Sequence, residues 1–79
     1  MKKSEYREES ETMKAVMKYL TEIRPLSEEG EYVAYADIAA GIEKTLGLRK
    51  SRHAIAFAIE RLCKIGKMAM YDRKLHILA

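Results

Sequence analysis

The stretch GLRKSRHAIAFAIERLCKIGKMAMYDRKLHIL, residues 47–78, changes its hydrophobic period at a single glycine. Before Gly66, apolar residues recur every three or four positions, which indicates a helix with one buried face. After Gly66, apolar and polar residues alternate on both sides of Asp72-Arg73, which indicates two short strands joined by a turn. The pattern therefore predicts a helix followed by a hairpin, over residues 52–65, 67–71 and 74–78.

The alternation also predicts the register of the hairpin. With Asp72-Arg73 as the turn, the apolar residues of the two strands face each other and share one side of the hairpin. The expected pairs are Met70 with Leu75 and Met68 with Ile77. Asp-Arg is not the Asn-Gly or Asp-Gly sequence that favours a two-residue turn, so a longer loop with a shifted register stays open.

A first helix is expected over about residues 10–24, with Ser10 as its N-cap. Its apolar residues share one helical face, and they are Met13, Val16, Met17, Leu20 and Ile23. Pro25 stops the helix, because proline disfavours helical geometry in the residue before it. A start near Ser4 stays open, because Tyr6 lies on the same stripe.

A second helix is expected over residues 36–46, after a polar loop at 25–31 and a brief extended segment at 32–35. Gly47 is placed to end this helix in a left-handed conformation. Ser51 is a favourable N-cap for the helix that follows. Two helices joined by such a short glycine-containing turn make a helix-turn-helix.

The buried faces of these elements define a small core, since a domain of this size buries only about 60% of its unfolded surface. The expected core residues are Val16, Leu20, Ile38, Ile42, Ile55, Ile59, Leu62, Met68 and Ile77. Ile65 is expected to close the buried stripe of the third helix.

Composition indicates one folded, helix-rich domain over residues 1–79, with residues 1–9 as a flexible or helical N-terminal arm. The chain is 48% apolar and 34% charged, with four glycines and one proline. No stretch is apolar enough to span a bilayer or to act as a signal peptide, so we expect an intracellular, cytoplasmic protein without a membrane partner. The single cysteine, Cys63, has no intramolecular disulfide partner and is expected in the core.

Charge is distributed unevenly along the chain. Residues 1–31 carry six Lys/Arg against eight Glu, whereas residues 32–79 carry nine Lys/Arg against four Asp/Glu. A basic second part favours a polyanionic partner. Solvated surface charge is the alternative explanation.

The order helix, short strand, helix, turn, helix, hairpin resembles the winged helix-turn-helix superfamily of DNA-binding proteins. The residues that carry the resemblance are ADIAAGIEKTLGLRKSRHAIAFAIERLCKIGKMAMYD, residues 36–72. Within them, DIA followed by LGL looks like the second helix and turn, and S-R-H-x-I-x-x-x-I-x-x-L-x-x-x-G looks like the recognition helix and the glycine before the wing. The resemblance implies a mainly α fold with a small β-hairpin (α+β), a three-helix winged helix-turn-helix domain. It also implies sequence-specific binding of double-stranded DNA in transcription regulation.

Positive charge at the start of the third helix opposes the helix dipole, unless an anion binds there. With this helix in the major groove and the hairpin on flanking phosphates, Arg49, Lys50, Arg52, Lys67 and Lys74 would meet phosphates. His53 and Ala56 would touch bases. The residues expected at the DNA are Arg49, Lys50, Ser51, Arg52, His53, Ala56, Phe57, Lys64, Lys67, Tyr71, Arg73 and Lys74.

Several alternatives stay open. An exposed Phe57 could contact a thymine methyl or pack against a protein partner, and in the second case the domain is a protein–protein adaptor that does not bind DNA. RNA binding is a third reading. Tyr6 and Tyr19 fit either a homodimer through the first helix or ordinary core packing.

The remaining expectations concern side-chain chemistry. Glu60 would repel phosphate unless it accepts a hydrogen bond from a cytosine amino group or pairs with Lys64, four residues later on the same helix, and we expect the pair with Lys64. The histidines and the cysteine have no recognised metal-ligand spacing, and no catalytic group can be assembled from these residues. We therefore expect no metal, no cofactor and no enzymatic activity.

Overall fold

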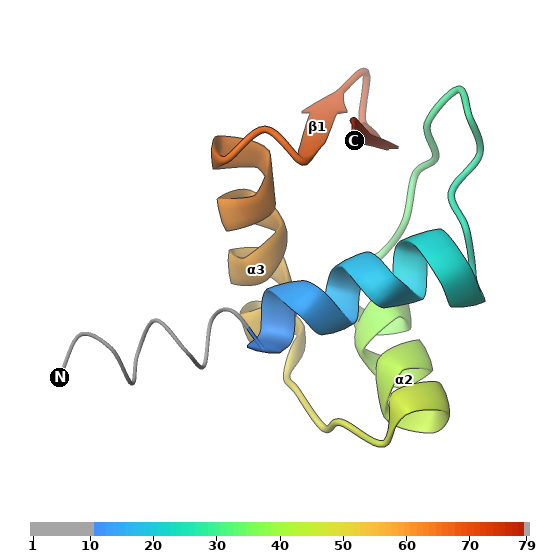
Figure 1. Ribbon diagram of the computed structural model, residues 1–79, viewed down its shortest axis with the longest axis vertical. Helices are drawn as coiled ribbons and strands as arrows, with labels where there is room; N and C mark the ends of the chain where they lie inside the picture. Colours follow the sequence, from blue (N-terminus) through green and yellow to red (C-terminus); the bar gives the residue numbers. More distant parts are fainter. Residues whose placement is uncertain (1–10, 79) are drawn as a thin grey trace, which may run out of the picture.

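The computed structural model describes residues 11–78 as three helical segments followed by a two-stranded antiparallel hairpin (Figure 1). The α-helix over residues 11–18 continues into a π-helical turn, η1, and the later elements follow in chain order. Their bounds are η1 (Tyr19–Ile23), α2 (Tyr35–Leu46), α3 (Arg52–Lys64), β1 (Met68–Tyr71) and β2 (Lys74–Ile77). The expected α+β fold class is confirmed, and the arrangement is compatible with a winged helix. The expectations for Ser4, Tyr6 and Ser10 lie outside the described residues.

The first helix ends just before Pro25 in the wider turn η1, in which the N–H of Arg24 donates to the carbonyl of Tyr19, five residues earlier, at 2.7 Å. The carbonyl of Leu20 accepts a hydrogen bond from the N–H of Leu26 at 3.2 Å, bypassing Pro25, which has no N–H to donate. A π-turn holds more residues than an α-turn and therefore rotates the following side chains away from the helical stripe. Ile23 is 37% exposed as a result, so its expected place on the buried stripe is wrong.

The turn between α2 and α3 follows the sequence prediction. Gly47 has φ +69° and donates its N–H to the carbonyl of Glu43 at 3.1 Å, which ends α2. The hydroxyl of Ser51 accepts from the N–H of Ala54 at 3.2 Å, which caps α3. Both termini are thus defined by local sequence, and α2 packs against α3 across this turn.

The end of α3 explains why one apolar residue leaves the core. Gly66 has φ +83°, its N–H donates to Cys63 at 3.1 Å, and the N–H of Lys67 donates to Leu62 at 2.9 Å. This double hydrogen bond is a Schellman motif, which closes the helix. Ile65 falls in the turn rather than on the helical face and is 54% exposed, so its expected burial is wrong.

The hairpin has the expected register with the two-residue turn. Asp72 and Arg73 have φ of +57° and +60°, which is the backbone of a type I′ turn. The longer loop with a shifted register does not occur. The observed pairs are Met68 with Ile77, Ala69 with His76, Met70 with Leu75 and Tyr71 with Lys74.

The core lies where the three helices meet the inner face of the hairpin, and most of its expected members are buried. The buried apolar residues are Val16, Tyr19, Leu20, Ile38, Ile42, Ile55, Ala58, Ile59, Leu62, Met68 and Leu75. Ile77, near the open end of β2, is only partly buried and packs against the edge of this core, so its expected place within the core is wrong. Met70, near the turn, is 45% exposed and faces a groove instead of the core.

The chain between η1 and α2 reaches up to the hairpin before it turns down into α2 (Figure 1). Glu31 pairs with Leu75 of β2 through two backbone hydrogen bonds of 3.1 and 2.8 Å. The bridge falls at Glu31, one residue before the extended segment expected at 32–35, and α2 begins at Tyr35, inside that segment. The residues that follow the bridge, including Tyr32, therefore lie beside the hairpin.

Candidate nucleic-acid interface

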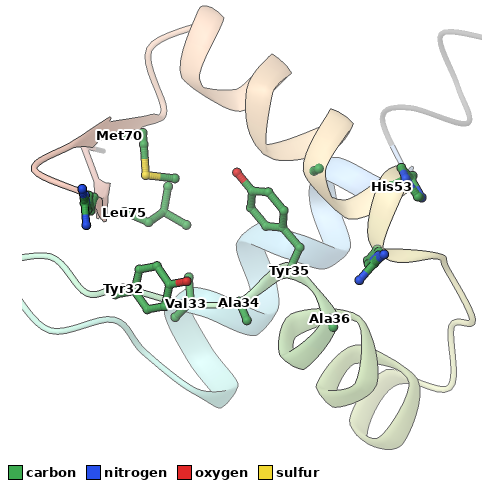
Figure 2. Close-up of a pocket in the computed structure, with 11 residues that line it drawn as sticks. Tyr32, Val33, Ala34, Tyr35, Ala36, His53, Met70 and Leu75 are labelled. Carbon is green, nitrogen blue, oxygen red and sulfur yellow. The ribbon is translucent and has the colours of Figure 1, made fainter.

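A groove of about 740 Å³ opens between α3, the hairpin and the segment that leads into α2 (Figure 2). Its basic residues come from two elements, and they are Arg52 and His53 of α3 and Arg73 of the hairpin turn. Its apolar and aromatic wall includes Tyr32, Val33, Tyr35, Met70 and Leu75. Figure 2 shows Tyr35 standing between α3 and the side chains of Met70 and Leu75.

The first turn of α3 makes one end of this groove electrically positive. Arg52 and His53 are both exposed, and no acidic residue lies in this turn. The positive end of the helix dipole adds to the charge of Arg52. An anion beside this turn would interact favourably with the side chains and the helix end together.

The start of α2 opens onto the same groove. Ala34, Tyr35 and Ala36 line the groove, and Ala34 is the N-cap. Alanine has no side chain that can accept from the first N–H groups of the helix, and no side-chain cap is formed. The groove therefore receives the positive ends of two helices, although Asp37 in the first turn of α2 offsets part of that charge.

A second hollow of about 530 Å³ continues the groove along α3. It shares Tyr35, His53, Ala56 and Met70 with the first and extends past Phe57 to Glu60 and Cys63. Phe57 is 47% exposed and Met70 is 45% exposed. The outward surface of α3 is thus basic at its start, apolar in the middle and acidic one turn further on.

Five of the residues expected at DNA border this continuous surface. They are Arg52, His53, Ala56, Phe57 and Arg73. Ser51 adjoins them, but its hydroxyl caps α3, so its role is to position the helix. Lys50 precedes the cap and is partly buried.

Arg49 is engaged with a neighbouring helix. Its Nε lies 3.1 Å from a carboxylate oxygen of Glu43, and both side chains are largely exposed. An exposed ion pair of this kind is weak. Glu43 nevertheless competes with a phosphate for Arg49, so Arg49 is a poorer phosphate ligand than the sequence indicated.

Other expected DNA contacts lie away from the groove. Lys67 borders a separate hollow of about 420 Å³ beside the first helix, together with Lys18 and Ile65. Lys64 is exposed and lines neither part of the groove.

The hairpin carries two of the expected residues on its outer face. Tyr71 stacks on His76 with ring centroids 3.9 Å apart and an interplanar angle of 6°. Lys74 pairs with Tyr71 across the strands and shares that face. Tyr71 therefore covers His76, and neither Tyr71 nor Lys74 lines the groove.

The structure adds Tyr32, Tyr35 and Met70 to the candidate surface, none of which was expected there. Tyr32 is 74% exposed. Two tyrosines three residues apart in a segment too short to form a core are a sequence signal for an aromatic surface. Strand alternation correctly placed Met70 on the inner side of the hairpin. It could not show that Met70 lies beyond the edge of the core and lines the groove.

Cys63, which lines the second hollow, is partly buried and packs against the edge of the core. Partial burial, and secondarily the charge of Glu60, raise the pKa of the Cys63 thiol. Contrary to expectation, no ion pair joins Glu60 to Lys64 in the described part of the chain. Among residues 11–78, no three His, Cys, Asp or Glu side chains are grouped to hold a metal ion.

No family model, curated protein or solved structure matches the chain. The fold and the site define it as a small α+β domain with a winged-helix layout and a basic, aromatic groove beside its third helix. No helix within residues 11–78 has the length and apolar character to cross a membrane.

Proposed function

We propose that this chain binds double-stranded DNA sequence-specifically, as a small transcription regulator, with α3 in the major groove and the hairpin beside it. One observation carries the proposal. Arg52 of α3 and Arg73 of the hairpin turn, far apart in sequence, line the same groove as His53 and Ala56. Cations from both elements on a common side are what DNA binding by this layout requires.

Phosphates would be held by Lys50, Arg52 and Arg73, together with the uncapped start of α2. Arginine side chains and helix N-termini are common ligands of phosphate oxygens and fix the register of a protein on the duplex. Lys67 and Lys74 lie elsewhere, so the proposed phosphate contacts are fewer than the sequence indicated.

Base edges would be read by His53 and Ala56. The first turns of the recognition helix reach the base edges in helix-turn-helix docking. His53 is exposed and offers a ring nitrogen as donor or acceptor, while Ala56 brings the helix close to the bases. A homodimer through the first helix would place two copies on half-sites about one helical turn apart.

The test removes one positive charge at a time, either from the groove or from the first helix, and compares the effects on DNA binding. Arg52→Ala and Arg73→Ala should each weaken binding to a short fluorescent duplex of random sequence, measured by anisotropy at low salt. Lys18→Ala removes one positive charge from the first helix, away from the groove, and should leave binding nearly unchanged. Equal effects of all three substitutions would show attraction by net charge alone and would contradict the proposed surface.

A protein–protein adaptor is the second candidate, favoured by the exposed apolar surface that Phe57 and Met70 share. An exposed patch of this kind often marks a protein contact. Failure to bind any duplex at about 50 mM salt, where electrostatic attraction is strong, would favour the adaptor.

A further inference from the structure

We propose that the outward face of α3 recognises the 5-methyl groups of thymine, so that the preferred duplex carries A·T pairs where the second turn of this helix meets the bases. This inference rests on the proposed function. It adds the class of base pair that the interface reads.

The hydrogen-bonding capacity of the outward face is low. Along the second hollow, the outward residues of α3 before Glu60 are His53, Ala56 and Phe57. Only His53 among the first three can donate or accept a hydrogen bond. The second turn of the helix must therefore discriminate bases by apolar contact or not at all.

Thymine is the base that offers an apolar group in the major groove. Its C5-methyl contacts alanine and phenylalanine side chains, whereas the other base edges present hydrogen-bond donors and acceptors. Covering those groups with the ring of Phe57 would leave them without partners, which is unfavourable. Phe57 is 47% exposed, and Ala56 leaves room for a methyl group beside it.

The spacing on the helix predicts where the methyl group lies. His53 and Phe57 are four residues apart, which is about 6 Å along a helix axis. Successive base pairs are about 3.4 Å apart. For a helix lying along the groove, the methyl groups read by Phe57 would be about two base pairs from the base that His53 contacts.

Charge around the apolar surface favours DNA over a protein as its occupant. Arg52 and Arg73 line the groove that leads into this surface, and His53 and Ala56 belong to both hollows. A ligand covering Phe57 would also lie against those cations. A duplex brings phosphates and methyl groups together in this way.

The experiment compares duplexes that differ only in the 5-methyl group. Alternating A·T duplexes are prepared with thymine or with uracil, and alternating G·C duplexes with cytosine or with 5-methylcytosine. The wild-type protein should bind the methylated member of each pair more tightly, by about fourfold for each methyl group removed from water. Phe57→Ser should bind both members of each pair equally.

Two controls separate this effect from other causes. Lys50→Ala should weaken binding to every duplex while keeping the methyl preference, since phosphate contacts carry no sequence information. A circular-dichroism melt checks that Phe57→Ser, a change at a half-exposed position, is folded.

Each other outcome overturns the inference in a distinguishable way. Equal binding of thymine and uracil duplexes by the wild type would contradict methyl recognition while leaving DNA binding intact. If folded Phe57→Ser still prefers the methylated duplexes, the preference arises from DNA shape and not from contact with Phe57. Failure to bind any duplex at low salt would remove the proposed function as well.

Discussion

At the scale of single residues, Gly41 shows how closely the first helix approaches α2. A Cβ atom at this position would collide with the phenol of Tyr19, which is only 9% exposed. Glycine in a helix interior ordinarily costs about 1 kcal/mol relative to alanine. The close approach of Tyr19 accounts for its presence here.

Gly41→Ala should therefore lower the stability of the domain. Helix propensity alone predicts a gain of about 1 kcal/mol, whereas overpacking against Tyr19 costs roughly 1–3 kcal/mol. Thermal unfolding measures the balance. Ala40→Gly, at an exposed neighbouring position of α2, calibrates the propensity effect. A higher melting temperature for Gly41→Ala would show that Tyr19 moves aside freely.

The surroundings of Cys63 reduce the reactivity of its thiol group. Partial burial, and then the charge of Glu60, raise the pKa of the thiol, so the reactive thiolate is scarce at neutral pH. Iodoacetamide should alkylate Cys63 at pH 8 more slowly than a cysteine in a short peptide. Glu60→Gln should lower the pKa and speed the reaction. Alkylation faster than in the peptide would identify Cys63 as a reactive thiol.

Among the elements, the hairpin turn contains a residue, Arg73, that has a strained backbone and also belongs to the proposed DNA-binding surface. Arg73 has φ +60°, a conformation that costs an L-residue about 1–2 kcal/mol and costs glycine almost nothing. It also supplies the hairpin's cation in the groove.

Arg73→Gly should consequently stabilise the fold and weaken DNA binding. After the greater flexibility of glycine in the unfolded chain is deducted, we expect a gain of about 0.5 kcal/mol in the free energy of unfolding. Asp72→Gly is the matched control, because it relieves the same kind of backbone and keeps the cation. Thermal melts and anisotropy measure the two effects. A loss of stability in Arg73→Gly would contradict the type I′ turn.

The loop that carries the chain to the hairpin is closed by the carboxylate of Glu31. Glu31 accepts hydrogen bonds from Arg24 and from the N–H of Ser27, the latter at 3.0 Å. The hydrogen bond from Arg24, and then that from Ser27, lower the pKa of Glu31. A carboxyl group whose pKa is lower in the folded state stabilises the fold above its unfolded pKa of about 4.3. This contribution is lost as the pH falls through the folded pKa.

Glu31→Gln should therefore be less stable than the wild type at pH 7, and the difference should shrink as the pH falls below about 4. Because the ion pair between Arg24 and Glu31 is open to solvent, added salt should reduce the difference at pH 7. Chemical denaturation across this pH range measures it. If the stability difference between Glu31→Gln and the wild type does not change with pH, the loss of stability comes from altered hydrogen-bond geometry and not from the lost charge.

At the scale of the whole molecule, the parts that the sequence predicted correctly are those with local causes. The αL glycine at 47, the cap at Ser51, the glycine after the third helix at 66 and the hairpin register each depend on a few neighbouring residues. Arg52, in the first turn of α3, could be singled out as a candidate for the same reason, since the opposition of charge and dipole is visible in sequence.

The parts that sequence could not predict depend on tertiary placement. Ile23 and Ile65 fit a period of 3.6, but a π-turn and a helix end remove them from the buried face. The groove itself exists because Glu31 bridges β2 and brings the next residues beside the hairpin. No periodic pattern in the sequence indicates that long-range contact. The sequence therefore could not show that Arg52 and Arg73 line the groove whereas Lys67 and Lys74 do not.

The salt dependence of DNA binding shows whether α3 and the hairpin turn act together as one phosphate-binding surface. Three phosphate contacts, from Lys50, Arg52 and Arg73, predict that log K falls against log salt with a slope of about −3. Arg52→Ala should reduce the magnitude of the slope by about 1, and Lys18→Ala should leave it unchanged. A slope that is the same in wild type and Arg52→Ala, or no binding to duplex DNA at low salt, would show that α3 and the hairpin turn do not form a phosphate-binding surface.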